Sequence, residues 1–133
     1  GLEALRRPMR RRGLAVVVSD FLGDIDWARS LRAIGAHHEL LGVEVLDPRD
    51  VELPPVGPVT LRDAESGEIV DLDVTPQVRA DYARAAAAHR DEVLSAFRSA
   101  GGPVLSLRSD RDWIADTVRF VGTRRRTIAA GVR

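Results

Sequence analysis

The sequence contains no cysteine and no lysine, and only 5% of its residues are aromatic. The absence of cysteine excludes a disulfide framework, a thiolate nucleophile and any metal site built on thiolates. The longest apolar runs, such as Leu14–Val18, are far shorter than the roughly 20 apolar residues of a membrane-spanning helix. We therefore expect these residues to make no membrane contact and to lie in the cytoplasm, although a longer protein that contained them could carry a membrane anchor.

An excess of charge of one sign is also missing, because 20 arginines balance 20 acidic residues in a chain of 133. Such a chain has no long-range field that would attract nucleic acid. The run Arg6–Arg12 has no interleaved aromatic residues, which argues against stacking on single strands. The length fits one domain, so we expect a basic N-terminal segment at 1–13, the domain at 14–126 and a frayed tail at 127–133.

Three apolar runs predict buried strands of a parallel sheet, covered on both faces by amphipathic helices. The strands are expected at Leu14–Val18, Leu40–Leu46 and Val104–Leu107. The first helix is expected to begin at Asp24 or Asp26, since either residue can cap it.

Two further helices and a hairpin complete the predicted fold. A long helix begins at Thr75, where a capping hydroxyl precedes Pro76. A closing helix follows Ser109, which with Asp112 three residues on resembles a capping box with Asp in place of Glu. Between the strands, Val59–Val74 alternates apolar and polar residues, which predicts a hairpin outside the main sheet. The chain therefore predicts a three-layer α/β fold, a mainly parallel sheet with helices on both faces plus a β-hairpin excursion.

Hydroxyl and carboxylate side chains follow the predicted strands, at the edge where α/β sheets gather ligands. They are Ser19, Asp20, Asp24, Asp47, Asp50, Ser109 and Asp110. Such oxygens can hold Mg²⁺, but Asp and Ser are also favoured as helix caps and turn residues. Capping is the favoured interpretation for Asp47, Asp50 and Asp110, whereas both interpretations stay open for Asp20.

The usual catalytic patterns are absent, including a Gly-rich phosphate loop and a nucleophile elbow. His37 and His38 are adjacent and point in different directions, which suits a helix end better than a shared metal. His89 lies on the apolar stripe of its helix, as a satisfied core histidine does. We identify no catalytic and no cofactor-binding residue, and we expect a protein that is not an enzyme.

The run Val16–Phe21, followed by Trp27, resembles a bacterial von Willebrand factor A-like family called domain of unknown function fifty-eight. The likeness covers nearly all of residues 10–126 and continues through His38–Leu40, Val45–Asp50, the Gly67 hairpin, Thr75, Trp113 and Arg124–Arg126. Members of this family are often encoded beside MoxR-type AAA+ ATPases. The resemblance implies a partial von Willebrand factor A-like fold of the Rossmann type.

The resemblance also bears on metal binding. Von Willebrand factor A domains hold a metal ion with an Asp-x-Ser-x-Ser motif after the first strand, a Thr, and an Asp after the fourth strand. Asp20 matches that last element and is the position that carries over as a possible metal residue. The first motif is absent, so the chain resembles the latter half of the domain, and Mg²⁺ is expected only in a complete domain. Phe21 also replaces the Gly that follows this Asp in most adhesion-type domains.

Such domains act as scaffolds, so the resemblance implies a protein-interaction module, a scaffold or adaptor linked to a MoxR-type AAA+ ATPase in complex assembly. One alternative is a Mg²⁺-dependent phosphate-handling enzyme that uses Asp20 and Asp24, and another is a purely structural fragment with no ligand. A half-domain would also leave one side of the strand Leu14–Val18 unpaired, and this strand contains no charge or proline to protect its edge. We therefore expect a homo-oligomer through the Leu14–Val18 edge, with no nucleic acid as partner.

Overall fold

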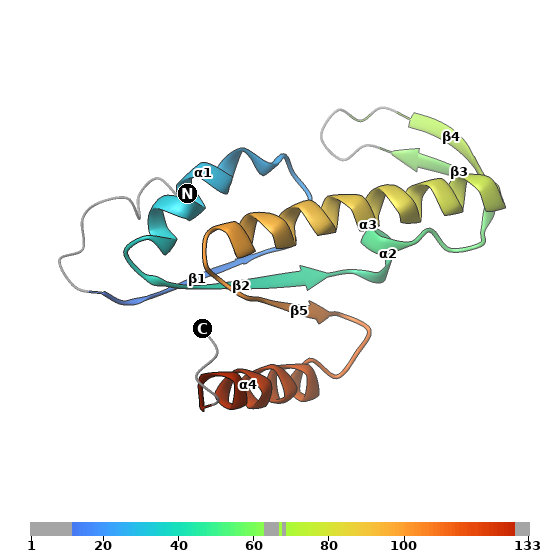
Figure 1. The fold of residues 1–133 in the computed structure, drawn as a ribbon. Helices are drawn as coiled ribbons and strands as arrows, with labels where there is room; N and C mark the ends of the chain where they lie inside the picture. The colour runs from blue at the N-terminus through green and yellow to red at the C-terminus, as the bar shows by residue number, and fades with distance from the viewer. Residues whose placement is uncertain (1–11, 63–66, 68, 130–133) are drawn as a thin grey trace.

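A computed structural model describes residues 12–62, 67 and 69–129 (Figure 1). Its elements, in chain order, are β1 (Leu14–Ser19), η2 (Ile25–Trp27), α1 (Ala28–Gly35), β2 (Glu39–Leu46), α2 (Pro48–Val51), β3 (Gly57–Arg62), β4 (Ile69–Val74), α3 (Pro76–Ser99), β5 (Val104–Arg108) and α4 (Trp113–Ala129). The predicted basic segment lies mostly outside the described residues, and α4 extends to Ala129, beyond the predicted start of the tail at 127.

The main sheet has three strands in the order β1-β2-β5, and both pairings are parallel. Val43 sits at the centre, beside Val18 of β1 and Leu105 of β5. Helices α1 and α3 lie on one side of this sheet and α4 lies on the other (Figure 1). The α/β class and the mainly parallel sheet with helices on both sides are confirmed.

The predicted hairpin is also confirmed. β3 and β4 pair antiparallel as a separate two-stranded sheet, and Figure 1 shows this sheet beside the N-terminal half of α3. The hydroxyl of Thr60 donates a hydrogen bond of 2.7 Å to the Asp71 carboxylate across the two strands. The hairpin is thus an excursion from the main sheet.

The core lies between the sheet and the pair α1 and α3. Its buried residues are Phe21, Leu31, Ile34, Leu40, Val93, Phe97 and Ala100. Phe97 packs directly against the backbone of Gly42, where a Cβ would lie 2.7 Å from the phenyl ring. Burial of large apolar side chains at this density is the main stabilising contribution to such a fold.

The helix starts were predicted with mixed success. The Thr75 hydroxyl accepts a hydrogen bond from the Val78 amide at 3.2 Å, with Pro76 in the first turn, as expected. The prediction that Ser109 caps α4 was wrong, because Asp112 Oδ1 accepts from the amides of Ile114 and Ala115, both at 3.0 Å. The aspartate lies directly before the first helical residue, where its carboxylate reaches these donors.

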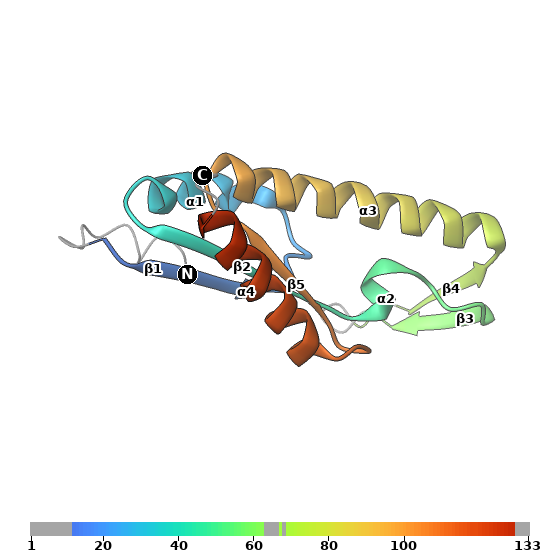
Figure 2. The same ribbon diagram turned by 60° about the horizontal axis from the view of Figure 1, so that its bottom comes forward.

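The prediction that the first strand is covered on both faces was wrong for the described chain. Ala15 and Val17 pack against the core, whereas Leu14, Val16 and Val18 are 58%, 45% and 62% exposed. Side chains alternate between the two faces of a strand, and α4 lies over β5 and leaves β1 uncovered on that face (Figure 2). A uniformly apolar run therefore has one buried and one open face.

Candidate functional site

The carboxyl ends of β1 and β2 border a hollow of about 220 Å³. Its polar lining comes from the turn after β1, from β2, from α2 and from α3. The polar residues are Asp20, Glu44, Asp50, Tyr82, His89 and Arg90. Of the side chains predicted to gather at the strand ends, two line this hollow, Asp20 and Asp50. The other five do not, namely Ser19, Asp24, Asp47, Ser109 and Asp110.

Asp20 is engaged locally in the turn after β1. Its Oδ1 accepts hydrogen bonds from the Ser19 hydroxyl at 3.3 Å and from the Leu22 amide at 3.4 Å. Asp24 precedes the short helix η2 without a side-chain capping bond. Among the described residues no group of three or more His, Asp or Glu side chains is placed to hold a metal ion. The donor set around Asp20 therefore does not fit Mg²⁺, which needs several oxygens at about 2.1 Å in near-octahedral geometry.

The other predicted strand-end carboxylates have structural roles, as expected. Asp47 and Asp50 form a capping box at α2, in which Asp47 accepts from the Arg49 amide and Asp50 accepts from the Asp47 amide. Asp110 accepts two hydrogen bonds of 2.9 Å from the Arg108 guanidinium. These bonds, the largest cause, lower the pKa of the Asp110 carboxyl from its ordinary value.

Two of the histidines, His38 and His89, form hydrogen bonds with backbone groups. His89 Nε2 donates a hydrogen bond of 2.6 Å to the Phe21 carbonyl, so this half-buried ring is satisfied, as its place on the helix stripe predicts. His38 Nδ1 accepts from the Gly13 amide at 3.2 Å, and both His37 and His38 follow the end of α1, as expected. Neither contact provides a base beside a nucleophile.

Tyr82 closes one side of the hollow. Its hydroxyl donates to the Arg49 carbonyl at 3.0 Å and ties α3 to α2. Partial burial, and secondly the nearby Asp50 carboxylate, raise the pKa of the Tyr82 phenol. The phenol therefore stays protonated at neutral pH and acts as a hydrogen-bond donor to the backbone.

The sequence patterns did not predict a buried charge cluster, of which Glu44 and Arg90 line the hollow. Glu44 is 1% exposed on β2. It accepts hydrogen bonds from Arg90 Nε and Nη2, both at 3.2 Å, and from the Ser106 hydroxyl at 2.6 Å. One acidic residue inside the apolar run Leu40–Leu46 was the available signal, but its partners lie 46 and 62 residues away along the chain.

An exposed apolar surface lies on the side of the sheet that faces away from α1 and α3. We call it the open face and define it by its exposed apolar residues Leu14, Val16, Val18, Ile114, Val118 and Val121. The last three recur at helical spacing on α4, on the side away from Arg119 and Thr123, which line a pocket beside β5. Large exposed apolar patches of this kind mark interaction surfaces.

The outer edge of β1 adjoins the open face. The Glu39 amide donates to the Gly13 carbonyl at 2.9 Å, and backbone groups in a parallel strand alternate between its two neighbours. The N–H groups of Leu14, Val16 and Val18 therefore point away from β2, where the described chain has no further strand. The expectation that Leu14–Val18 forms an edge strand is confirmed.

Within residues 12–62, 67 and 69–129, no helix combines the length and the apolar content that crossing a bilayer requires.

Comparison with known proteins places the chain among relatives of undefined role. A family model described as "Protein of unknown function DUF58" matches residues 1–92. "Uncharacterized protein Rv1480" of Mycobacterium tuberculosis and "Uncharacterized protein Mb1516" of Mycobacterium bovis are each 62% identical over 130 residues, or 98% of this chain and 41% of theirs. "Uncharacterized protein MAV169" of Mycobacterium avium is 60% identical over 130 residues and is covered over 77% of its length. No solved structure matches significantly.

Proposed function

This chain belongs to the DUF58 family, and within that family we propose that it is a protein-interaction module, a scaffold or adaptor. The observation that supports this function is the open face. Val18 and Val118 are 62% and 67% exposed on the two elements that border it. Covering such side chains contributes about 25 cal/mol per Å² of apolar surface, so a protein partner would stabilise the chain at this place.

We also propose that the architecture is the latter half of a von Willebrand factor A-like domain of the Rossmann type. In the complete fold the strand equivalent to β1 is internal, and its outer neighbour comes from the preceding half. Two facts support this proposal: β1 is at the edge of a parallel sheet, and the chain spans 41% of the length of the longer relatives. In those proteins another part of the polypeptide would cover the open face.

For the chain by itself, the exposed edge of β1 favours a second copy of the same chain as the binding partner. Two β1 edges related by a two-fold axis would pair antiparallel, which satisfies the outward N–H groups and brings the exposed side chains of the two β1 strands into contact across the new strand pair. Light scattering on dilute protein should report a dimer or a higher oligomer. Val18→Glu should give a monomer, whereas Val56→Glu, at a residue 54% exposed outside this face, should not change the mass.

A monodisperse, soluble wild-type monomer would overturn self-association. The same pair of variants tests the proposed assembly partner, a MoxR-type AAA+ ATPase, which rests on the family resemblance. Purified ATPase should bind the wild type and Val56→Glu, and should bind Val18→Glu at least tenfold more weakly if about 1.4 kcal/mol of apolar contact is lost. Equal binding by all three proteins would place the ATPase contact elsewhere. Mg²⁺-dependent phosphatase activity that Asp20→Asn abolished would instead support the enzymatic alternative with Asp20 and Asp24.

A further inference from the structure

We propose that the outer edge of β5, at the side of the sheet opposite β1, binds an extended acidic peptide. The proposal is independent of the open face, because it concerns the other edge of the sheet and other side chains. It rests on a pocket rich in arginine and on backbone groups of β5 that lack a strand partner in the described chain.

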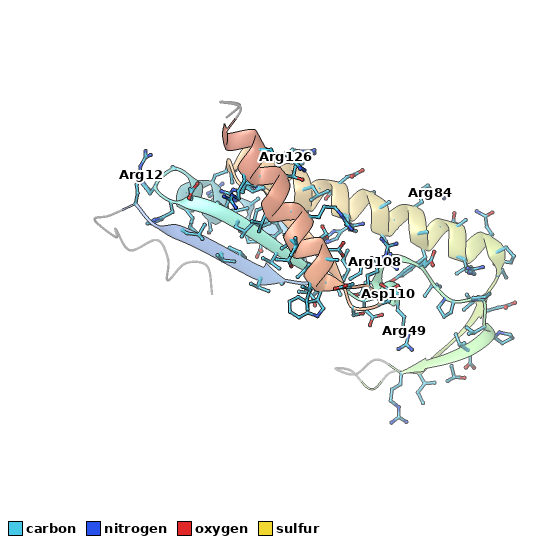
Figure 3. All side chains as sticks on the ribbon, turned by 90° about the horizontal axis from the view of Figure 1, so that it is seen from below. Arg12, Arg49, Arg84, Arg108, Asp110 and Arg126 are labelled. Atoms are coloured by element: carbon cyan, nitrogen blue, oxygen red, sulfur yellow. The ribbon has the colours of Figure 1, made fainter. Side chains whose placement is uncertain are left out.

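The pocket has a volume of about 520 Å³ and wraps around the edge of β5. It is lined on one side by Arg90 of α3 and on the other by Asp116, Arg119 and Phe120 of α4, with β5 between them. Arg108, at the end of β5, lies between α3 and the start of α4 (Figure 3). The pocket is therefore an open groove along a strand, not an enclosed cavity.

Four guanidinium groups line this groove, from Arg90, Arg108, Arg111 and Arg119. Three of them pair with carboxylates, namely those of Glu44, Asp110 and Asp116. Each guanidinium has five N–H donors, so these pairs leave donors unused.

Arg111 has no side-chain ion pair within the part of the chain that the structure describes. Among the described residues, Asp116 is the one aspartate or glutamate that lines the groove itself. The groove therefore has more positive than negative charge at its surface, and it complements a ligand with carboxylates.

The backbone of β5 adds a second recognition element. The Ser109 amide donates to the Leu46 carbonyl at 2.9 Å, and the Gly42 amide donates to the Pro103 carbonyl at 2.9 Å. Because backbone direction alternates along a strand, the N–H groups of Ser106 and Arg108 point to the outer edge. β5 ends the sheet order β1-β2-β5, so these groups can pair with an added strand.

An extended peptide can contact both the guanidinium groups of the groove and the outward N–H groups of β5, whereas a free anion would contact only the guanidinium groups. Its side chains would alternate between the α3 side, near Arg90 and Arg108, and the α4 side, near Arg119 and Phe120. Acidic residues would meet the guanidinium groups, and an apolar residue would contact the Phe120 ring. The preferred partner is thus a strand that mixes acidic and apolar residues.

The test uses the full chain and a fluorescent peptide of about eight alternating glutamate and valine residues, a usual strand length. A matched peptide with glutamine for glutamate and inorganic phosphate are the comparison ligands. We expect the glutamate peptide to bind at low salt and to lose affinity as salt rises. Arg111→Gln should weaken it about fivefold, the upper range for an exposed charge pair. Arg84→Gln, an exposed arginine on α3 away from the groove, should leave binding unchanged.

Hydrogen exchange measured by NMR separates strand addition from simple charge attraction. The peptide should slow exchange of the Ser106 and Arg108 amides and leave the inward Leu105 amide unchanged. Equal effects of Arg111→Gln and Arg84→Gln, or equal binding of both peptides, would overturn the proposal. Displacement of the peptide by millimolar phosphate without protection of the Ser106 amide would assign the groove to a free anion and overturn the peptide as ligand.

Discussion

The ring of Phe21 packs edge-on against the ring of Phe97, with 5.4 Å between their centroids, although the Phe21 backbone has a φ of 54°. A non-glycine residue in this region costs about 1 kcal/mol. Trp27 completes the cluster at 5.4 Å from Phe21 and 5.8 Å from Phe97. Aromatic burial therefore offsets backbone strain at the position that directly follows Asp20.

Phe21→Ala should lower the free energy of unfolding by about 3 kcal/mol, because a ring that is 6% exposed is replaced by a cavity. Phe21→Gly removes one more carbon but also relieves the positive φ. We therefore expect Phe21→Gly to be at least as stable as Phe21→Ala in urea unfolding. A glycine variant clearly less stable than the alanine variant would show that the strain is negligible.

Arg90→Met should destabilise the chain by about 3 kcal/mol, because it leaves the buried Glu44 without its counter-charge. This value is the lower end of the expected range, since the Arg90 side chain is 32% exposed and water can reach it. The matched control is Arg84→Met, whose side chain is 74% exposed on the same helix and pairs with Asp81. The double variant Glu44→Leu, Arg90→Met should recover much of the lost free energy of unfolding. Chemical denaturation of the wild type, the two single variants and the double variant measures this recovery.

The Asp110 carboxyl should titrate below its ordinary pKa of 3.8 in an NMR pH titration. Because the folded-state pKa is lowered, the stabilising contribution of the Arg108 pair is present at neutral pH and is lost as the pH falls through that lowered value. Arg108→Gln should return the pKa toward the ordinary value, and Arg84→Gln should not. No difference between these two variants would mean that the bidentate pair does not persist in solution.

Calorimetric titration of the chain with Mg²⁺ should show no binding below millimolar concentration. Asp20 Oδ1 already accepts hydrogen bonds from the Ser19 hydroxyl and the Leu22 amide. A site that binds Mg²⁺ tightly needs several protein oxygens. The control is Asp20→Asn, which should give the same titration as the wild type. Micromolar binding that this variant abolished would contradict the half-domain proposal and support a metal-dependent activity.

Much of the fold follows from local patterns. Thr75 and Pro76 define the start of α3, and the alternation over Val59–Val74 defines the hairpin, because capping and pleat periodicity act between neighbours in the chain. The interpretation of Asp47 and Asp50 as caps was correct for the same reason.

Tertiary structure decided what local patterns leave undetermined. The apolar run of β1 specifies a strand, but only the placement of α1, α3 and α4 determines that Val17 is covered and Val16 is exposed. Likewise, Glu44 lies in an apolar run, and its carboxylate can be buried there only because Arg90 and Ser106, from distant parts of the chain, donate hydrogen bonds to it. Burial and charge pairing depend on neighbours in space, and a single sequence specifies periodicity along the chain without specifying which elements meet.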